Sequence, residues 1–289
     1  MERKPLGATP VQIPAIGFGT WRYSGGVEPL RAVVERGPCL LDTAEIYGTE
    51  ELVGEVIRGR RQQVFLATKA APRNFRRADL IRAAENSLRR LGTDYIDLYQ
   101  LHWPNLTVPV QETMSAMEEL ADAGKIRFIG VSNFSTGCLR RAQAALSRHK
   151  IVSNQVCYSL IDRTIESGLL PYCQQNSITV IAFSPLGLNF AALREADPVG
   201  VLAQVASESG KTEAQVALNW LIAKKNVIAI PKASTIAHAL EDREAAGWRL
   251  SAGQYALLES EVRFRRNGPL HALARDCRRY VLQYLGRGI

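Results

Sequence analysis

The chain has 289 residues, 46% of them hydrophobic, a length that suits one large domain with a substantial core better than two full-sized domains. Its formal net charge is +8, but the basic residues stand in short clusters without interleaved aromatic residues, which argues against a nucleic-acid-binding stripe. No stretch approaches the ~20 apolar residues of a membrane span, and no apolar run of signal-peptide length follows the first residues.

The cysteines bear on the cellular compartment. There are five, an odd number, and no two of them form a CxxC pair. Scattered cysteines in a chain of this size are typical of reduced, intracellular proteins. We therefore expect a cytoplasmic protein, a monomer with one domain over residues 1–289, that acts on a small molecule and binds neither nucleic acid nor membranes.

Short apolar runs recur along the chain. Their near-continuous hydrophobicity, without polar alternation, is typical of strands that are covered on both faces. Eight such runs occur, at residues 15–19, 39–42, 64–68, 96–101, 126–131, 153–156, 179–183 and 227–230.

Amphipathic segments lie between these runs. Residues 79–91 place apolar side chains along one helical face, and residues 212–215 are typical of a capped helix start. Eight strand–helix alternations predict an α/β fold, a closed (β/α)8 TIM barrel. Residues 3–13 are expected to form an N-terminal hairpin that closes the bottom of the barrel. The tail from Ser251 onward is expected to be helical, with two helical stretches.

One motif near the start resembles a dinucleotide-binding fingerprint. Gly17 and Gly19 follow an apolar run, as the first two glycines of that fingerprint would. The third glycine would fall at position 22, which is Arg22, and no long helix opens there. The pattern therefore excludes a Rossmann site here.

Four polar residues follow or end consecutive predicted strands. Asp42 ends the second run and Tyr47 lies five residues later, while Lys69 follows the third run and His102 the fourth. Each has an ordinary structural explanation when taken alone. Because active sites of such barrels lie at the carboxyl ends of the strands, we expect all four side chains to face one small volume.

This group suits the protonation of a carbonyl oxygen. A tyrosine is a weak acid, with an ordinary pKa of about 10, and a nearby ammonium group lowers that pKa. Lys69 would thus make Tyr47 a usable acid, Asp42 would hold the lysine, and a neutral His102 would orient the substrate oxygen. Such a proton is useful only if a nucleophile reaches the carbon, and hydride from a nicotinamide is the natural candidate.

Three motifs resemble those of the aldo-keto reductases. They are LDTAEIYG at residues 41–48, Thr68-Lys69, and LYQLHWP at residues 98–104, and the resemblance runs in order from about residue 5 to about 245. It implies that Tyr47 is the general acid and that Asp42, Lys69 and His102 support it.

The same resemblance implies a cofactor site for NADPH. Residues 130–134 are similar to the family's carboxamide-binding segment, Phe183 matches its stacking aromatic residue, and residues 230–234 resemble its adenosine-phosphate segment. The implied cofactor-binding residues are Thr20, Ser132, Asn133, Gln155, Phe183, Ser184, Pro185, Leu186, Gly187, Lys232, Ser234, His238, Glu241 and Asp242.

Two of these residues depart from the pattern of many members that prefer NADPH. His238 stands where those members carry an arginine, and Asp242 stands where they carry an asparagine. Arginine binds a phosphate through two parallel hydrogen bonds and is always charged, whereas histidine is not. An aspartate that pointed inward would repel the phosphate. Lys232 still favours NADPH, and use of NADH stays open.

The resemblance also implies a substrate pocket walled by Trp21 and Trp103. The loop after His102 is short, with a helix expected from about Pro109, which predicts an open pocket for small aldehydes, ketones or α-dicarbonyls. The arginines of the tail (Arg263, Arg265, Arg266) would favour anionic substrates if they closed over one side, but an exposed basic helix is the simpler interpretation.

Other functions compete with reduction. A regulatory barrel that binds the cofactor as a redox sensor, with little turnover, would keep the same fold. Lys69 would also suit a Schiff-base aldolase. A metal-dependent hydrolase is disfavoured because the four histidines are scattered and form no His-x-His motif, so we expect no metal.

Overall fold

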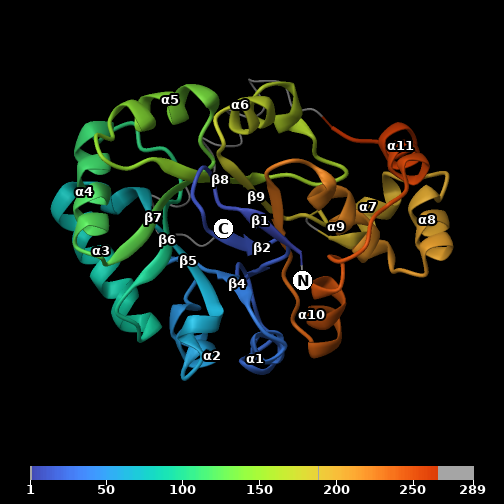
Figure 1. Cartoon of the computed structure of the whole chain (residues 1–289), viewed down its shortest axis with the longest axis horizontal. Coiled ribbons are helices and arrows are strands. Elements are labelled where there is room, and N and C mark those ends of the chain that lie inside the picture. The colour runs from blue at the N-terminus through green and yellow to red at the C-terminus, as the bar shows by residue number, and fades with distance from the viewer. Residues whose placement is uncertain (1, 188, 266–289) are drawn as a thin grey trace.

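The computed structural model describes residues 2–187 and 189–265, and its centre is a barrel of parallel strands (Figure 1). Each strand pairs with the next along the chain, and the first and last meet through backbone hydrogen bonds between Gly17 and Ala229 (2.8 Å) and between Ala229 and Ala15 (3.0 Å). The predicted eight-stranded TIM barrel is therefore confirmed. The strands are β3 (Phe18–Gly19), β4 (Cys39–Asp42), β5 (Val64–Ala70), β6 (Ile96–Leu101), β7 (Ile126–Ser132), β8 (Ile151–Cys157), β9 (Thr179–Phe183) and β10 (Val227–Ile230).

Helices cover the outside of the strands (Figure 1). They connect each strand to the next, because parallel neighbours need a crossover. Helix α9 starts with the predicted capping box, in which the Thr212 hydroxyl accepts from the Gln215 N–H while the Gln215 side chain accepts from the Thr212 N–H. The connecting helices are α1 (Glu28–Glu35), α2 (Glu50–Ile57), α3 (Arg77–Leu91), α4 (Val110–Asp122), α5 (Thr136–Ala144), α6 (Leu169–Gln175) and α9 (Glu213–Ala223), and α10 (Ile236–Arg243) follows the last strand.

A hairpin of β1 (Arg3–Pro5) and β2 (Gln12–Pro14) closes the amino-terminal end of the barrel, as predicted. The Gly7 N–H donates to the Thr179 hydroxyl (2.7 Å), at the start of β9. Gly7 has φ +57°, and a Cβ there would lie 2.8 Å from the Val152 carbonyl oxygen. The hairpin therefore packs too closely on the strands for any larger residue at this turn.

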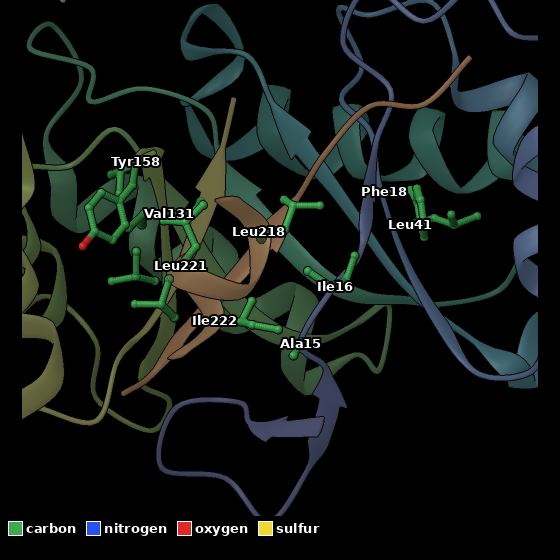
Figure 2. Packing of buried hydrophobic residues seen from close by; sticks show 14 of the residues in the cluster. Ala15, Ile16, Phe18, Leu41, Val131, Tyr158, Leu218, Leu221 and Ile222 are labelled. Carbon is green, nitrogen blue, oxygen red and sulfur yellow. The ribbon is translucent and has the colours of Figure 1, made fainter. Parts of the chain in front are cut away.

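Two apolar layers fill the molecule. Inside the barrel, Leu6 and Ile13 of the hairpin segment pack with inward side chains of the strands, Leu40 and Ile181 among them. Outside the strands, a larger cluster joins them to the helices, and Figure 2 shows Leu218, Leu221 and Ile222 of α9 within it. Burying a side chain of this size contributes roughly 1.5–3 kcal/mol each, so these layers provide most of the driving force for folding.

Three helices lie outside the strand–helix repeat. The sequence did not lead us to expect α7 (Phe190–Glu195) and α8 (Val201–Ser209), which precede α9. Helix α11 (Ala252–Glu261) confirms the first helical stretch of the predicted tail, and it packs against α8. The second stretch, with Arg266, lies outside the described residues. Within the described residues, no helix is both long and apolar enough to cross a membrane.

Candidate active site

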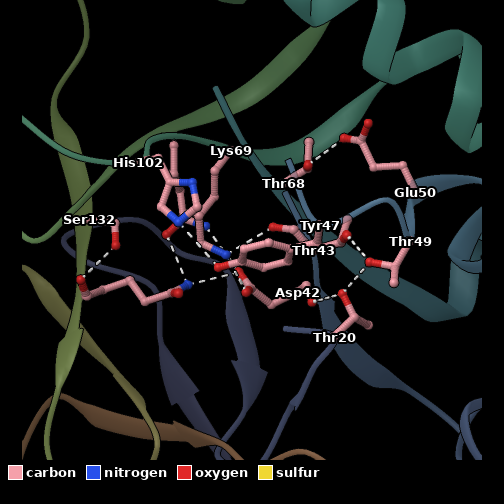
Figure 3. A network of polar contacts seen from close by, with 12 residues as sticks. Thr20, Asp42, Thr43, Tyr47, Thr49, Glu50, Thr68, Lys69, His102 and Ser132 are labelled. Carbon is pink, nitrogen blue, oxygen red and sulfur yellow. Dashed lines mark hydrogen bonds and ion pairs between the residues drawn. The ribbon is translucent and has the colours of Figure 1, made fainter. Parts of the chain in front are cut away.

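The four predicted polar residues come together at the carboxyl ends of the strands (Figure 3). Asp42 is the last residue of β4, Lys69 is the next-to-last residue of β5, and His102 directly follows β6. Tyr47 lies in the loop between β4 and α2. Asp42, Tyr47 and His102 line a cavity of about 750 Å³, whereas Lys69 is fully buried and is not among the lining residues.

Lys69 and Asp42 form a buried ion pair. The Lys69 side chain is fully buried, and its Nζ donates to Asp42 Oδ1 (2.5 Å) and to the Thr43 carbonyl oxygen (2.9 Å). Burial lowers the pKa of Lys69, and the charge of Asp42 opposes that change. Gln100 and Gln155 both donate to Asp42 Oδ2, at 3.1 Å and 2.8 Å. The carboxylate is thus held on both oxygens, which fixes the position of the ammonium group.

Tyr47 and His102 face each other across the cavity floor. The Tyr47 hydroxyl lies 3.2 Å from His102 Nε2, and the Lys69 ammonium nitrogen lies 5.0 Å from the centre of the Tyr47 ring. Burial holds the pKa of His102 well below its ordinary value, and the positive charge of Lys69 adds to that effect. The imidazole is therefore neutral at physiological pH, with one nitrogen facing the phenol.

Three threonine hydroxyl groups form a chain of hydrogen bonds next to Asp42. The Thr20 hydroxyl lies 3.1 Å from the Asp42 carbonyl oxygen and 2.9 Å from the Thr49 hydroxyl, which is also 2.9 Å from the Thr43 hydroxyl. Thr20 is fully buried and is not among the residues that line the cavity. Its side chain binds the backbone of β4 through the Asp42 carbonyl oxygen, and its predicted contact with the cofactor stays a prediction.

The residues predicted to bind the carboxamide of the nicotinamide lie at the carboxyl ends of β7 and β8. The Asn133 side chain donates to the His102 carbonyl oxygen (3.1 Å) and to the Ser132 hydroxyl (2.9 Å), and the Ser132 hydroxyl donates to the Gln155 carbonyl oxygen (2.9 Å). All three residues line the cavity. Asn133 has φ +62°, a left-handed conformation that asparagine tolerates better than most residues.

The remaining predicted cofactor residues divide into two groups. Phe183 ends β9, residues 184–187 follow it, and all of them line the cavity. Lys232 lines the cavity next to β10, and its Nζ donates to the Arg22 carbonyl oxygen (3.2 Å). The others are not among the lining residues. They are Ser234, His238, Glu241 and Asp242.

Three members of that second group lie on α10 and differ in their surroundings. His238 is exposed, and the Glu241 carboxylate accepts from the Thr212 hydroxyl (2.6 Å). Asp242 is 4% exposed, and within the described part of the chain its carboxyl group forms no hydrogen bond or ion pair. Burial raises the pKa of Asp242 to about 8, and the charge of Glu241 adds to this. Asp242 therefore carries little negative charge at neutral pH.

Aromatic side chains form the cavity walls. Trp21 and Trp103 both line it, as predicted, and Phe190 of the unexpected helix α7 joins them. Helix α4 begins at Val110, so the loop after His102 is short, as the sequence indicated. Sequence reasoning did not single out Glu45 or Arg73, which also line the cavity.

The surroundings of Lys69 argue against Schiff-base chemistry. Its amine is fully buried, does not line the cavity and is bound by Asp42 and Thr43. A substrate carbonyl carbon would have to displace both partners to reach it. Within the described residues, no group of three or more His, Cys, Asp or Glu side chains is placed to hold a metal ion.

Comparisons with known proteins agree with this geometry. The chain is 41% identical over 264 residues to the methylglyoxal reductase YeaE of Escherichia coli (strain K12), covering 86% of this chain and 91% of that protein. It is also similar to solved structures. One is an aldo/keto reductase from Klebsiella pneumoniae in complex with NADP and acetate, with a TM-score of 0.83, 39% identity and coverage of 92% of this chain and 98% of that chain.

Another is a thermostable aldo-keto reductase in complex with the inhibitor epalrestat, with a TM-score of 0.84, 43% identity and coverage of 90% of this chain and 99% of that chain. The model of the aldo/keto reductase family matches residues 15–262, which is most of the chain. The chain is therefore an oxidoreductase that belongs to the aldo/keto reductase family.

Proposed function

We propose that this protein reduces small aldehydes, ketones or dicarbonyl compounds to alcohols with NADPH, and that Tyr47 donates the proton. One observation carries the proposal. A phenol and a neutral imidazole line one cavity and a buried ammonium group lies close to the phenol, with Tyr47 Oη 3.2 Å from His102 Nε2 and Lys69 Nζ 5.0 Å from the centre of the Tyr47 ring. This set of groups suits the delivery of one proton to a carbonyl oxygen.

The residues on one side of the cavity fit a nicotinamide cofactor. Asn133 and Gln155 offer amide groups, Phe183 offers a half-buried aromatic face, and Lys232 offers a positive charge at the rim. These are the groups that a carboxamide, an aromatic ring and a phosphate require. When bound, NADPH supplies the hydride for the carbonyl carbon. The NADP in the Klebsiella pneumoniae relative supports this choice.

The protein's own side chains move and hold the proton. The Tyr47 hydroxyl donates its proton to the carbonyl oxygen as negative charge develops there. His102, kept neutral by burial, donates from Nε2 to the same oxygen and orients it. The Lys69 ammonium group, held by Asp42, stabilises the phenolate that remains on Tyr47.

The proposal for the substrate class follows from the walls and from one relative. Trp21 and Trp103 line the cavity of about 750 Å³ that also has to hold the cofactor, so their indole rings bound the part of it that is left for a substrate. The Escherichia coli relative is named for methylglyoxal, a small dicarbonyl compound. Both observations favour short carbonyl compounds over bulky ones.

Replacing Tyr47 tests the proposal. Tyr47→Phe removes the acidic hydroxyl and keeps the ring, so we expect the rate of NADPH oxidation with methylglyoxal to fall by about 10²–10⁴-fold, the usual contribution of a general acid. NADPH binding, followed by fluorescence titration, should stay nearly unchanged. Retained turnover in the variant would remove Tyr47 from this role.

The wild-type protein itself separates the reductase from a sensor. Its rates with NADPH and with NADH, measured against aldehydes and dicarbonyls, should show oxidation of at least one cofactor. Tight NADPH binding without any oxidation would instead support a regulatory barrel. The ratio of the two rates would show which cofactor the protein prefers.

A further inference from the structure

Arg73 is a cavity residue that the chemistry above does not use. It lies in the single-turn helix η2 (Pro72–Asn74), which follows β5, and it lines the same cavity as Tyr47, His102 and Trp103. Its side chain is exposed. Among residues 2–187 and 189–265, no side chain or carbonyl group forms a hydrogen bond or ion pair with its guanidinium group. A permanent positive charge is thus available to a ligand in the cavity.

The backbone around Arg73 is held firmly. The Glu45 carboxylate accepts from the Ala71 N–H and from the Asn74 side chain (2.9 Å and 3.1 Å), and the Asn105 side chain donates to the Pro72 carbonyl oxygen (2.7 Å). Glu45 is therefore engaged with the segment itself and makes no ion pair with Arg73, although burial raises the pKa of Glu45 and the positive charge of Arg73 opposes that rise. A side chain with a free guanidinium group on a fixed backbone suits recognition of a ligand.

The order of the strands places Arg73 away from the proposed cofactor groups. The cavity-lining residues assigned to NADPH lie at or beyond the carboxyl ends of β7, β8, β9 and β10, which are consecutive in the sheet. Arg73 follows β5, between the strands that carry Tyr47 and His102. The positive charge assigned to a cofactor phosphate, Lys232, follows β10, which is separated from β5 by β3 and β4. Arg73 is therefore on the substrate side.

We propose that Arg73 binds a carboxylate group of the substrate, so that the preferred substrates are aldehydes or ketones that also carry a carboxylate. This inference rests on the proposed carbonyl reduction. A guanidinium group matches a carboxylate with two parallel hydrogen bonds, and a charge-assisted contact of this kind is about twice as strong as a neutral one. Arg73 then determines specificity, and it takes no part in proton transfer.

A matched pair of substrates tests this. The compounds 4-carboxybenzaldehyde and methyl 4-formylbenzoate have nearly the same shape and differ in charge. We expect Arg73→Met to lower kcat/KM for the carboxylate by about tenfold to a hundredfold, the size of one lost hydrogen bond to a charged group. The ester should change by no more than about threefold, as for a substitution outside the chemistry. Arg73→Lys, which keeps the charge, should retain part of the preference.

Arg76→Met is the matched control. Arg76 lies three residues further along, is exposed, is not among the cavity-lining residues, and carries the same charge. It should leave both substrates unchanged. If Arg73→Met and Arg76→Met lowered kcat/KM for the carboxylate substrate equally, the effect would come from the overall positive charge and not from contact with Arg73. That result would overturn the assignment. Equal losses for acid and ester in Arg73→Met would place Arg73 in cofactor binding or in folding, and would overturn it too.

Binding of benzoate to the NADPH-loaded protein separates this inference from the proposed function. Calorimetry should show weaker benzoate binding in Arg73→Met than in the wild type, whatever the rate of turnover. Benzoate binding that depends on Arg73, without oxidation of NADPH by either aldehyde, would contradict the reductase alone. Oxidation by the ester without any dependence on Arg73 for the acid would contradict only the carboxylate site.

Discussion

Asp42 and Asp242 are both almost fully buried, at 2% and 4% exposed, but their partners differ. Asp42 is bound by Lys69, Gln100 and Gln155, so both of its carboxylate oxygens have partners inside the protein. Asp242 forms no such contact with the described residues, and burial raises its pKa to about 8. A buried carboxyl group without partners costs free energy whenever it must ionise.

We expect Asp242→Asn to stabilise the protein, and more so as pH rises. The carboxyl group loses its proton near pH 3.8 in the unfolded chain and only near pH 8 in the folded one. Between these values the folded state binds more protons, so the wild type loses stability as pH increases. Urea unfolding at pH 5 and pH 8 should show a gain of about 1–3 kcal/mol at pH 8, the usual cost of an unsatisfied buried group, and a smaller gain at pH 5.

Glu244→Gln, an exposed acidic residue next to α10, is a suitable control for this measurement. It should give no such pH-dependent gain. An equal free energy of unfolding for wild type and Asp242→Asn at both pH values would show that Asp242 ionises freely in the folded protein.

Three of the four polar residues, Asp42, Lys69 and His102, were predicted to meet because they stand at the ends of apolar runs, where barrel geometry brings such residues together, and Tyr47 follows Asp42 in the next loop. Gln100 was not predicted, since it stands inside the run that forms β6, yet it binds Asp42. A polar residue within such a run is the signal that would have found it. Arg73 gave no signal, because exposed arginines are common and only the fold places this one beside the cavity.

At the scale of elements, the lack of a side chain at Gly130 of β7 allows side chains of the two neighbouring strands to pack closely against it. A Cβ at this position would lie 2.7 Å from the Ser153 hydroxyl of β8 and 2.9 Å from Cγ of Gln100 of β6. The register between β7 and β8 also shifts at this residue. The absent side chain therefore leaves room for Gln100 to reach Asp42.

Gly130→Ala should reduce both stability and activity. We expect a loss of about 1–3 kcal/mol in the free energy of unfolding, as for overpacking in other cores, because the atoms around it belong to packed strands. The rate should fall as well, since a displaced Gln100 no longer holds Asp42. Denaturant unfolding and NADPH oxidation would measure the two effects.

Gly137→Ala, in α5, is the control, because a Cβ there meets nothing closer than 3.9 Å. It should keep full activity and lose no stability. If Gly130→Ala behaved in the same way, the close packing around β7 would not limit this position.

Helices α7 and α8 were not predicted, because the expected strand–helix repeat has no place for them. Their boundaries are marked in the sequence, since Asn189 caps α7, the Asp197 carboxylate accepts from the Val201 and Leu202 N–H groups at the start of α8, and Gly210 follows its end. The eightfold alternation needs only one helix between β9 and β10, and α9 already fills that place. The prediction followed the expected repeat, and it therefore missed the two helices that these capping residues mark.

At the scale of the whole molecule, α11 is fastened to the barrel by charged groups. Glu259 of α11 accepts from Arg163 (2.8 Å), which is 1% exposed, and from Lys224 (3.0 Å). The Arg163 guanidinium group also lies 4.7 Å from the centre of the Trp220 ring. Both cations thus share the Glu259 carboxylate, and Lys224 has a second partner in Glu166, 3.4 Å from its Nζ.

We expect Glu259→Gln to destabilise the protein by about 1–3 kcal/mol, because it leaves a buried arginine without its counter-charge. Thermal unfolding should show a lower melting temperature. The exposed Glu261, two residues further on, gives the control, and Glu261→Gln should change the melting temperature little. Equal values for the two variants would mean that α11 is held by its apolar contacts alone.

Lys224 joins the two ends of the described chain. Its side chain binds Glu259 and Tyr255 of α11, and its carbonyl oxygen, with that of Ile222, accepts from Lys4 of the hairpin. Lys4 and Ile222 are 218 residues apart. During synthesis on a ribosome, the first strands therefore cannot pair with the last ones until most of the chain has emerged. Closure of the barrel is consequently a late step of folding, and contacts of such long range form slowly.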